Sequence, residues 1–242
     1  MKGKLIVIEG IDGSGKGTQS IMLFERLKKE GYPVEYADFP HYGKPSAAMI
    51  EEYLNGRLGP PSEISPKIAS ILYAVDRYAK SREMQEWLRE GKIIICNRYL
   101  TSNKGHQAGK IKDPAKIDEF LEWLDELEYG IFGIPRPDKV FLMRMPPEIA
   151  QNLIAKKSLR GYLNGKGRDE VEKDMGYLIC SDKAYQYVAK KEGWVAIELG
   201  REGKPLPIKE AHEILYNLVK REIEGQNREE LPSDRKPVQL PE

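Results

Sequence analysis

Five short apolar runs, each bounded by glycine, proline or charged residues, are spaced along most of the chain. They lie at residues 5–8, 34–39, 93–96, 140–145 and 194–199. The segments between them carry apolar residues at the spacing of a helix. Runs that are apolar throughout are typical of strands covered on both faces, whereas an exposed sheet would alternate. The pattern therefore predicts an α/β fold: a parallel sheet with helices on both sides.

The long stretch between the third and fourth runs is expected to hold a helix that faces the core. Its apolar residues recur at helical spacing: Ile117, Phe120, Leu121, Leu124 and Leu127. After Glu222 the chain becomes rich in charge, glycine and proline. We expect a single domain over residues 1–221 and a charged, flexible tail over residues 222–242.

A glycine-rich stretch between the first run and a predicted helix at residues 19–31 has the features of a phosphate-binding loop. It consists of Gly10, Ile11, Asp12, Gly13, Ser14, Gly15, Lys16, Gly17 and Thr18. Glycines let backbone N–H groups surround an anion, the helix start adds positive potential, and a lysine reaches the outer phosphates. A simple glycine turn would not explain Lys16 and Thr18. We therefore expect a nucleoside triphosphate site with ATP bound by these nine residues.

The loop departs from the usual pattern at one position. The residue after the lysine is normally Ser or Thr, which contacts Mg²⁺. Here Gly17 stands there, in the order Lys16-Gly17-Thr18 that adenylate-kinase-like enzymes have. The metal candidates are therefore Thr18 and Asp12.

Composition adds few restrictions. The chain has 242 residues, 40% of them hydrophobic, with 39 basic and 38 acidic side chains. The balanced charge gives no reason to expect nucleic acid or a membrane as partner. Cys96 and Cys180 lack metal-ligand spacing, so we expect two reduced thiols and a cytoplasmic location. The apolar run after Met1 is too short for a signal or an anchor.

Polar and aromatic side chains follow the second and third predicted strands. Residues 38–42 read Asp-Phe-Pro-His-Tyr, and residues 97–103 read Asn-Arg-Tyr-Leu-Thr-Ser-Asn. Ligands of open parallel sheets bind beyond the carboxyl ends of the strands, so these groups should meet near the loop. Tyr73 and Arg77 stand one helical turn apart, which suits stacking on a base and donation to its carbonyl. An ordinary surface pair has the same spacing.

The segment at residues 156–174 is polar, broken by glycine and rich in cations, among them Arg160 and Arg168. One interpretation is a basic flap that closes over the phosphates. The other is a solvated charged helix, which is the common fate of such runs.

Taken together, the motifs resemble thymidylate kinase, a family of P-loop nucleoside monophosphate kinases. The resemblance covers residues 3–200 and rests on segments in the same order and spacing: 10–19, 39–40, 73–77, 97–107, 135–138 and 168–174. It implies a three-layer P-loop kinase fold with a five-stranded parallel sheet and a mobile lid at 156–174. It also implies transfer of a phosphoryl group from MgATP to dTMP, usually by a homodimer.

The resemblance assigns roles to individual residues. The catalytic candidates are Lys16, Arg98, Asp12, Arg168 and Arg160. The dTMP candidates are Asp12, Phe39, Tyr42, Tyr73, Arg77, Arg98, Ser102, Asn103, His106 and Gln107. The lid candidates are Arg160, Arg168, Asp169 and Glu172. Because the loop carries Gly13 and Ser14 where some relatives place an arginine, the lid would supply the extra cation.

Two departures affect the chemistry. Asn97 stands where the family has an aspartate, which removes a negative charge close to the metal. His106 stands where the family has an aromatic ring that crowds the sugar 2′ position. A smaller, polar imidazole there would extend the acceptors to dUMP or UMP, although a lone histidine is also a common packing residue.

Two other functions remain open from the sequence. A kinase for another nucleoside monophosphate, such as CMP or AMP, would share the loop and differ at Tyr73, Arg77 and Asn103. A regulatory P-loop ATPase or GTPase is the second alternative. A guanine-specific switch would need Asn-Lys-x-Asp, whereas residues 103–106 read Asn-Lys-Gly-His.

Overall fold

The computed structural model describes residues 2–61, 63–155 and 175–225. The predicted lid at 156–174, with Arg160, Arg168, Asp169 and Glu172, lies outside the described residues, and so does the chain from 226 to 242.

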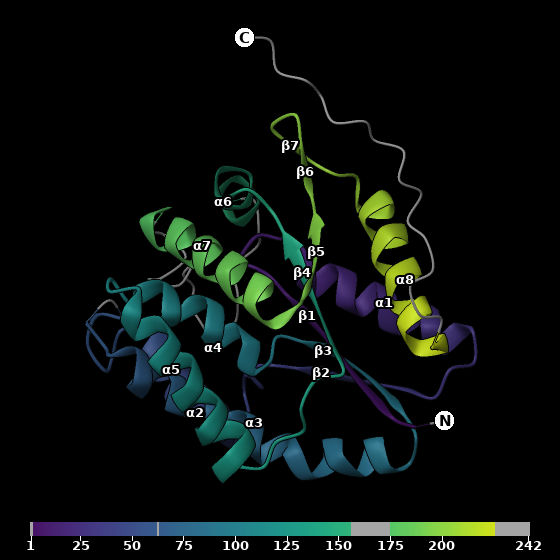
Figure 1. The fold of residues 1–242 in the computed structure, drawn as a ribbon, viewed down its shortest axis with the longest axis horizontal. Coiled ribbons are helices and arrows are strands. Elements are labelled where there is room, and N and C mark those ends of the chain that lie inside the picture. Colours follow the sequence, from purple (N-terminus) through teal and green to yellow (C-terminus); the bar gives the residue numbers. More distant parts are fainter. Residues whose placement is uncertain (1, 62, 156–174, 226–242) are drawn as a thin grey trace.

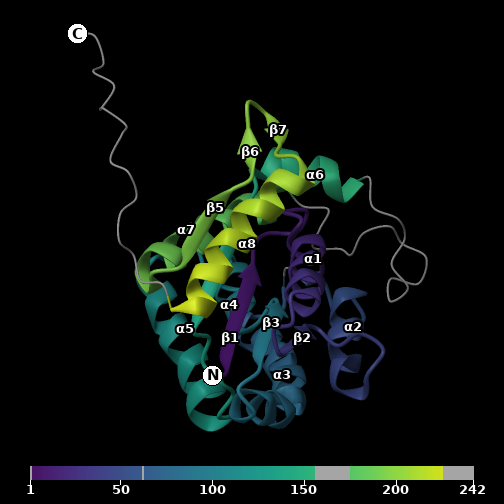
Figure 2. The same cartoon turned by 90° about the vertical axis from the view of Figure 1, so that its right-hand side faces the viewer.

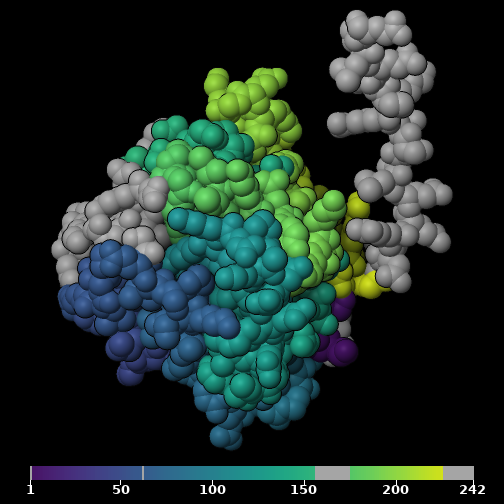
Figure 3. All heavy atoms as spheres, turned by 60° about the vertical axis from the view of Figure 1, so that its left-hand side comes forward, coloured from purple at the N-terminus to yellow at the C-terminus, as the bar shows by residue number. Residues whose placement is uncertain are grey.

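The described residues confirm the predicted parallel sheet (Figure 1). Its strands are β1 (Lys4–Glu9), β2 (Val34–Asp38), β3 (Ile93–Asn97), β4 (Lys139–Arg144) and β5 (Val195–Glu198). They lie in the order β2-β3-β1-β4-β5, and all four pairings are parallel. A small antiparallel hairpin of β6 (Gly200–Arg201) and β7 (Lys204–Pro205), which the sequence pattern did not predict, protrudes beyond β5 (Figure 3).

Helices connect the strands and cover both faces. The long ones are α1 (Lys16–Lys29), α3 (Pro66–Arg89), α5 (Ala115–Asp125), α7 (Met175–Glu192) and α8 (Ile208–Glu224). The shorter ones are η1 (Pro45–Ala47), α2 (Ala48–Leu54), α4 (Leu100–His106), η2 (Ala108–Lys110), η3 (Glu126–Ile131) and α6 (Pro147–Ala155). Helices α1 and α8 lie side by side on one face, whereas α3, α4, α5 and α7 lie on the other (Figures 1 and 2).

Alternation along β1 explains the three layers. Ile6 and Ile8 belong to the cluster that contains the apolar side of α1 and α8. Leu5 and Val7 point the other way, into the cluster beneath α3 and α4. All four are completely buried, which is why the strand reads as a continuous apolar run.

Three element boundaries differ from the sequence prediction. Helix α1 begins at Lys16, three residues before the predicted start at 19, so the end of the phosphate-binding loop is the first helical turn. The helix predicted through Leu127 changes at Glu126 into a π-helix, η3. Helix α8 continues to Glu224, so the first residues of the expected tail are helical.

Two further expectations concern thiols and membrane spans. Cys96 is buried and Cys180 is exposed, and both are free thiols. Over the described ranges, none of the helices combines the length and the apolar character that a membrane crossing requires.

Replacing Leu27 with alanine tests the α1–α8 layer. Leu27 is completely buried in the larger core cluster, so Leu27→Ala leaves a cavity and should lower the free energy of unfolding by about 2 to 5 kcal/mol. On the same helix, Ile21 is 46% exposed, and Ile21→Ala should change it by no more than about 0.5 kcal/mol. Urea denaturation measures both. Similar values for the two variants would contradict the assigned layer.

Candidate active site

The phosphate-binding loop joins β1 to α1 in a conformation that needs glycine. Gly13 and Gly15 have φ angles of 82° and 85°, which lie in the left-handed region. A Cβ atom on Gly13 would come within 2.3 Å of the carbonyl oxygen of Ala150. The loop is thus held by close approach to α6 as well as by its own torsions.

Lys16 bends back over the loop that precedes it. Its side chain is buried, and Nζ donates to the carbonyl oxygen of Ile11 at 3.1 Å. The same Nζ lies 3.4 Å from Oδ1 of Asp12. This cation therefore lies at the surface of the loop that would receive a polyphosphate.

Arg98 reaches the loop from the end of β3. Its φ angle of 65° is unusual for a residue other than glycine, and it turns the chain directly after the strand. The guanidinium forms an ion pair with Asp12, and a second nitrogen of the group lies 3.1 Å from Nε2 of His106. Asp12 thus bridges two cations, Lys16 at the start of α1 and Arg98 directly after β3.

Glu9, at the end of β1, is a residue that the sequence analysis missed. Its completely buried carboxylate accepts hydrogen bonds from the Tyr99 N–H at 2.9 Å and from Oγ1 of Thr101 at 2.7 Å. It also accepts from Oγ of Ser102 at 2.9 Å and from the hydroxyl of Tyr185 at 2.9 Å. Burial and this carboxylate raise the pKa of the Tyr185 hydroxyl well above its usual value. Glu9 therefore ties β1 to the start of α4 and to α7.

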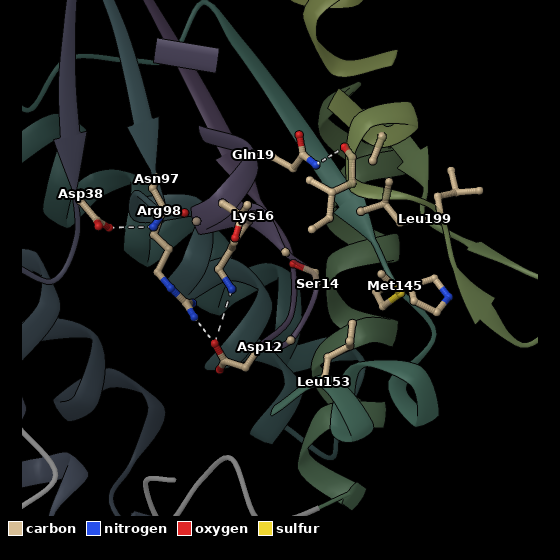
Figure 4. Close-up of a pocket in the computed structure, with 18 of the residues that line it drawn as sticks. Asp12, Ser14, Lys16, Gln19, Asp38, Asn97, Arg98, Met145, Leu153 and Leu199 are labelled. Atoms are coloured by element: carbon tan, nitrogen blue, oxygen red, sulfur yellow. Dashed lines mark hydrogen bonds and ion pairs between the residues drawn. The ribbon is translucent and has the colours of Figure 1, made fainter. Parts of the chain in front are cut away.

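A cavity of about 790 Å³ opens in front of the loop. Figure 4 shows that one side of it is polar, with Asp38, Arg98 and Lys16, and the other apolar, with Leu199 and Met145. The polar side carries loop residues 12–18 together with side chains from the ends of β2 and β3: Asp38, Phe39, Tyr42, Asn97 and Arg98. The predicted convergence of the two strand ends on the loop is confirmed in part: Asp38, Phe39, Pro40, Tyr42, Asn97 and Arg98 line this cavity, whereas His41 and residues 99–103 do not.

The apolar side was not foreseen from the sequence. It consists of Met145, Leu153, Leu199, Pro205, Leu206, Pro207, Ile208 and Ala211. These residues belong to the ends of β4 and β5, to α6, and to the segment that leads from the hairpin into α8. Each is an ordinary apolar residue in sequence, and only the fold brings them together. An apolar surface beside a phosphate loop suits the base of a nucleotide.

The predicted base-reading residues lie apart from this cavity, around α3. Arg77 is buried and forms a two-pronged ion pair with Glu128, with Nε and NH2 each 2.6 Å from a carboxylate oxygen. Its NH1 donates to the Tyr99 carbonyl at 3.3 Å. Asn103 Nδ2 lies 3.4 Å from the same Glu128 carboxylate. The alternative of an exposed surface pair is therefore wrong for Arg77.

Glu128 is the second residue that the sequence analysis missed. It lies on the π-helix η3 and is completely buried. Burial alone lowers the pKa of Arg77, but the Glu128 charge and hydrogen bonds outweigh it and raise that pKa. The structure distinguishes this segment by its π-turn, but a π-turn has no sequence pattern. The sequence therefore offers no reason to single out Glu128.

Tyr73 and Phe39 lie against other aromatic rings. Tyr73 meets Tyr53 edge to face with ring centroids 6.2 Å apart, and the Tyr53 hydroxyl accepts a hydrogen bond from Lys110 at 2.8 Å. Phe39 packs against Tyr99 at 5.9 Å. The aromatic residues proposed for an acceptor thus have defined positions on α3 and at the end of β2.

His106 and Gln107 are both buried at the end of α4. The His106 ring stacks on Tyr177 with centroids 5.8 Å apart. Burial lowers the pKa of His106 to about 3; the nearby Asp12 charge opposes this shift and the Arg98 charge adds to it. The ring is therefore neutral, and it accepts the Arg98 hydrogen bond at Nε2.

The oxygen ligands at the loop are compatible with Mg²⁺. Thr18, Asp12 and Asp38 all line the cavity. The described part of the chain contains no group of three or more His, Cys, Asp or Glu side chains arranged for a metal ion. Mg²⁺ bound to nucleotide phosphates keeps several waters and needs only one or two protein oxygens. The residues therefore fit a metal that arrives with the nucleotide.

The fold and the site together define a P-loop kinase of the nucleoside monophosphate type, with a glycine-rich loop, a facing arginine and a separate polar cluster around α3. The family model described as "Thymidylate kinase" matches residues 8–204. The chain belongs to the thymidylate kinase family.

Individual relatives agree with this assignment. The chain is 30% identical to the thymidylate kinase of Mycobacterium tuberculosis over 78% of this chain and 87% of that one. It is 28% identical to a probable thymidylate kinase of Pyrococcus abyssi over 93% of this chain and 100% of that one. The solved structure of thymidylate kinase from Candida albicans has the same fold, with a TM-score of 0.70, 22% identity, and coverage of 91% and 92% of the two chains.

The neutral state of His106 predicts a pH dependence of stability. In the unfolded chain the imidazole gains a proton below about pH 6.5, whereas burial keeps it neutral in the folded protein down to a pKa of about 3. Acidification thus favours the unfolded state, at up to about 1.4 kcal/mol per pH unit for one proton. Between pH 7 and pH 5 the free energy of unfolding of the native protein should fall by about 1 to 2 kcal/mol more than that of the His106→Gln variant.

Urea denaturation at several pH values measures this difference. The comparison uses the slopes of the two proteins, because the substitution itself changes the packing against Tyr177. Equal slopes for the two proteins would show that His106 takes up its proton without unfolding.

Proposed function

We propose that this protein transfers the γ-phosphoryl group of ATP to the 5′-phosphate of dTMP and releases dTDP and ADP. The proposal rests on a cavity in which Arg98 faces the phosphate-binding loop and its Lys16, in a chain of the thymidylate kinase family. In the residues that the structure describes, no feature favours the alternative acceptors or a regulatory switch.

The reaction requires little covalent chemistry from the protein. An oxygen of the dTMP phosphate forms a bond to the γ-phosphorus while the bond to the ADP oxygen breaks, and the transferred group passes between the two nucleotides. Lys16 and Arg98 would lie on either side of Asp12 and neutralise the charge of the migrating group. The lid candidates Arg168 and Arg160 remain predictions.

Mg²⁺ is the proposed metal. When bound with ATP it would supply positive charge that offsets the charge of the phosphates. Thr18 and Asp12 are the candidates from the sequence, and both line the cavity. The exposed Thr18 hydroxyl follows Gly17 in the first turn of α1, which places it at the helix N-terminus.

The acceptor base is proposed to bind beside α3. Tyr73 would stack on thymine, while Arg77 and Asn103 would bond to the base edge. Both polar residues contact the Glu128 carboxylate, so one buried anion would hold both readers of the base. Phe39, Tyr42, Ser102, His106 and Gln107 remain the other proposed acceptor residues.

We also propose a homodimer and a cytoplasmic location. Helix α3 exposes an apolar stripe at helical spacing: Ile68, Ile71, Val75 and Tyr78. The opposite side of the helix carries Arg77 and Asp76, which are buried toward the proposed acceptor site. Pairing of two stripes would cover this apolar surface. The free thiols Cys96 and Cys180 support a reducing compartment.

The activity is tested with ATP, Mg²⁺ and a panel of nucleoside monophosphates, with each product identified by chromatography. We expect dTMP to be converted well ahead of dCMP, because the cytosine amine would face the Arg77 donor. Lys16→Met should lower kcat by at least about 100-fold, whereas Lys29→Met, an exposed lysine of the same helix, should leave it unchanged. ATP hydrolysis that does not depend on an acceptor would contradict the proposal.

The dimer is tested by light scattering after size exclusion. The double variant Ile71→Lys, Val75→Lys places two charges on the stripe and should convert a dimer to a monomer. Ile21→Lys changes an apolar residue that is 46% exposed on α1, on the other face of the sheet from α3, and should leave the mass unchanged. A native protein that is monomeric at micromolar concentration would contradict the homodimer.

A further inference from the structure

Asp38 is a cavity carboxylate to which neither the sequence motifs nor the family comparison gives a role. Two carboxylates line the cavity among the described residues, Asp12 and Asp38. They differ in their partners. Asp12 is engaged by two cations, with Arg98 in direct ion pair and Lys16 Nζ at 3.4 Å. Among the described residues, Asp38 forms no ion pair with a cation, and the one hydrogen bond that it accepts from them comes from the neutral amide of Asn97 at 2.7 Å.

The position of Asp38 follows from the register of the sheet. Asp38 is the last residue of β2 and pairs with Asn97, the last residue of β3. The Asn97 amide lies against the first turn of α1, where a Cβ atom on Gly17 would be 3.7 Å from Nδ2 of Asn97. Asn97 therefore lies between the start of α1 and Asp38, and Figure 4 shows its hydrogen bond to the Asp38 carboxylate.

The Asp38 side chain is also open to a ligand. The residue is exposed, whereas its neighbours Ala37 and Phe39 are each 2% exposed. The protein that surrounds this carboxylate raises its pKa by partial desolvation, although the Asn97 hydrogen bond and the Arg98 charge act in the opposite direction. A partly desolvated carboxylate without a cation partner is a favourable place for a hydrated divalent cation.

We infer that Asp38, oriented by the amide of Asn97, is the carboxylate that holds the hydrated metal ion of the bound nucleotide. The inference rests on the proposed function, because the metal enters with ATP. It makes Asp38 a residue that positions the metal through its water shell, while Asp12 remains tied to the two cations. It also accounts for the neutral Asn97 at the end of β3. The negative charge that the metal needs is supplied by Asp38, which ends the adjacent strand β2.

The test compares nucleotide binding with and without metal in Asp38→Asn. This change is isosteric and keeps an oxygen that accepts the Asn97 hydrogen bond. Without metal, removal of a negative charge near the phosphates should leave ATP binding unchanged or make it tighter. With metal, binding should weaken. Mn²⁺ affinity of the complex with a non-hydrolysable ATP analogue, measured by electron paramagnetic resonance, should fall by about 10- to 100-fold.

Glu35→Gln is the matched control. Glu35 lies on the same strand and pairs with Lys92 at 2.8 Å, away from the cavity. The Glu35→Gln substitution removes one negative charge from β2, as Asp38→Asn does, and should leave the Mn²⁺ affinity at the native value. Calorimetry of metal-free ATP binding supplies the second readout for all three proteins.

Two outcomes would overturn the inference. Equal loss of ATP affinity with and without metal would show that Asp38 only supports the local structure. An unchanged Mn²⁺ affinity in Asp38→Asn would show that the metal is held elsewhere, while dTMP phosphorylation by the native protein would still support the proposed function. A native protein that binds no ATP would instead contradict the proposed function itself, and with it the inference.

Discussion

The site depends on the buried carboxylate of Glu9 at the end of the central strand. This single group accepts hydrogen bonds from a backbone N–H and from the hydroxyls of Thr101, Ser102 and Tyr185. A buried carboxylate is strongly unfavourable unless its oxygens are satisfied. The donors come from the start of α4 and from α7, so satisfying Glu9 requires both helices to be in place. The loop, which begins one residue after Glu9, is thereby joined to the opposite face of the sheet.

Arg98 is positioned by the same arrangement. It lies between Asn97, the last residue of β3, and Tyr99, whose N–H is bound by Glu9. With the backbone fixed on both sides, its positive φ angle is imposed by the fold. The guanidinium then meets Asp12 and His106, and its direction is set before any ligand binds. Such preorganisation is what electrostatic catalysis of phosphoryl transfer requires.

The ion pair of Arg77 and Glu128 lies in the proposed acceptor site. Both side chains are buried, at 2% and 0% exposure. Removal of one partner from such a pair leaves an uncompensated charge, which costs about 3 to 5 kcal/mol. The pair therefore links α3 to η3 at the position where Asn103 also reaches the carboxylate. In the proposed acceptor site, local stability and base recognition depend on the same carboxylate.

The sequence predicted the parts of the site that are built from neighbours in the chain. Residues 10–18 join a strand to a helix because glycines with positive φ are needed there. Asp38 ends β2, and Phe39 and Arg98 directly follow β2 and β3, which lie within the predicted runs. The rules for parallel sheets then place these ends at one edge. Partners from distant segments were missed. Glu9 stands between the first apolar run and the glycine-rich loop, where its sequence position shows no partner, and Glu128 lies in a helix whose π-turn has no sequence signature.

The sequence by itself thus determined the layered α/β fold, the phosphate-binding loop and the cations that face it, because each depends on local torsions and short periodicities. Only the tertiary structure decided which buried carboxylate meets which donor, which apolar residues form the wall opposite the loop, and that Asp12 rather than Asp38 is paired with cations. Those choices depend on the sheet register and on contacts between segments far apart in the chain. No local pattern encodes such contacts.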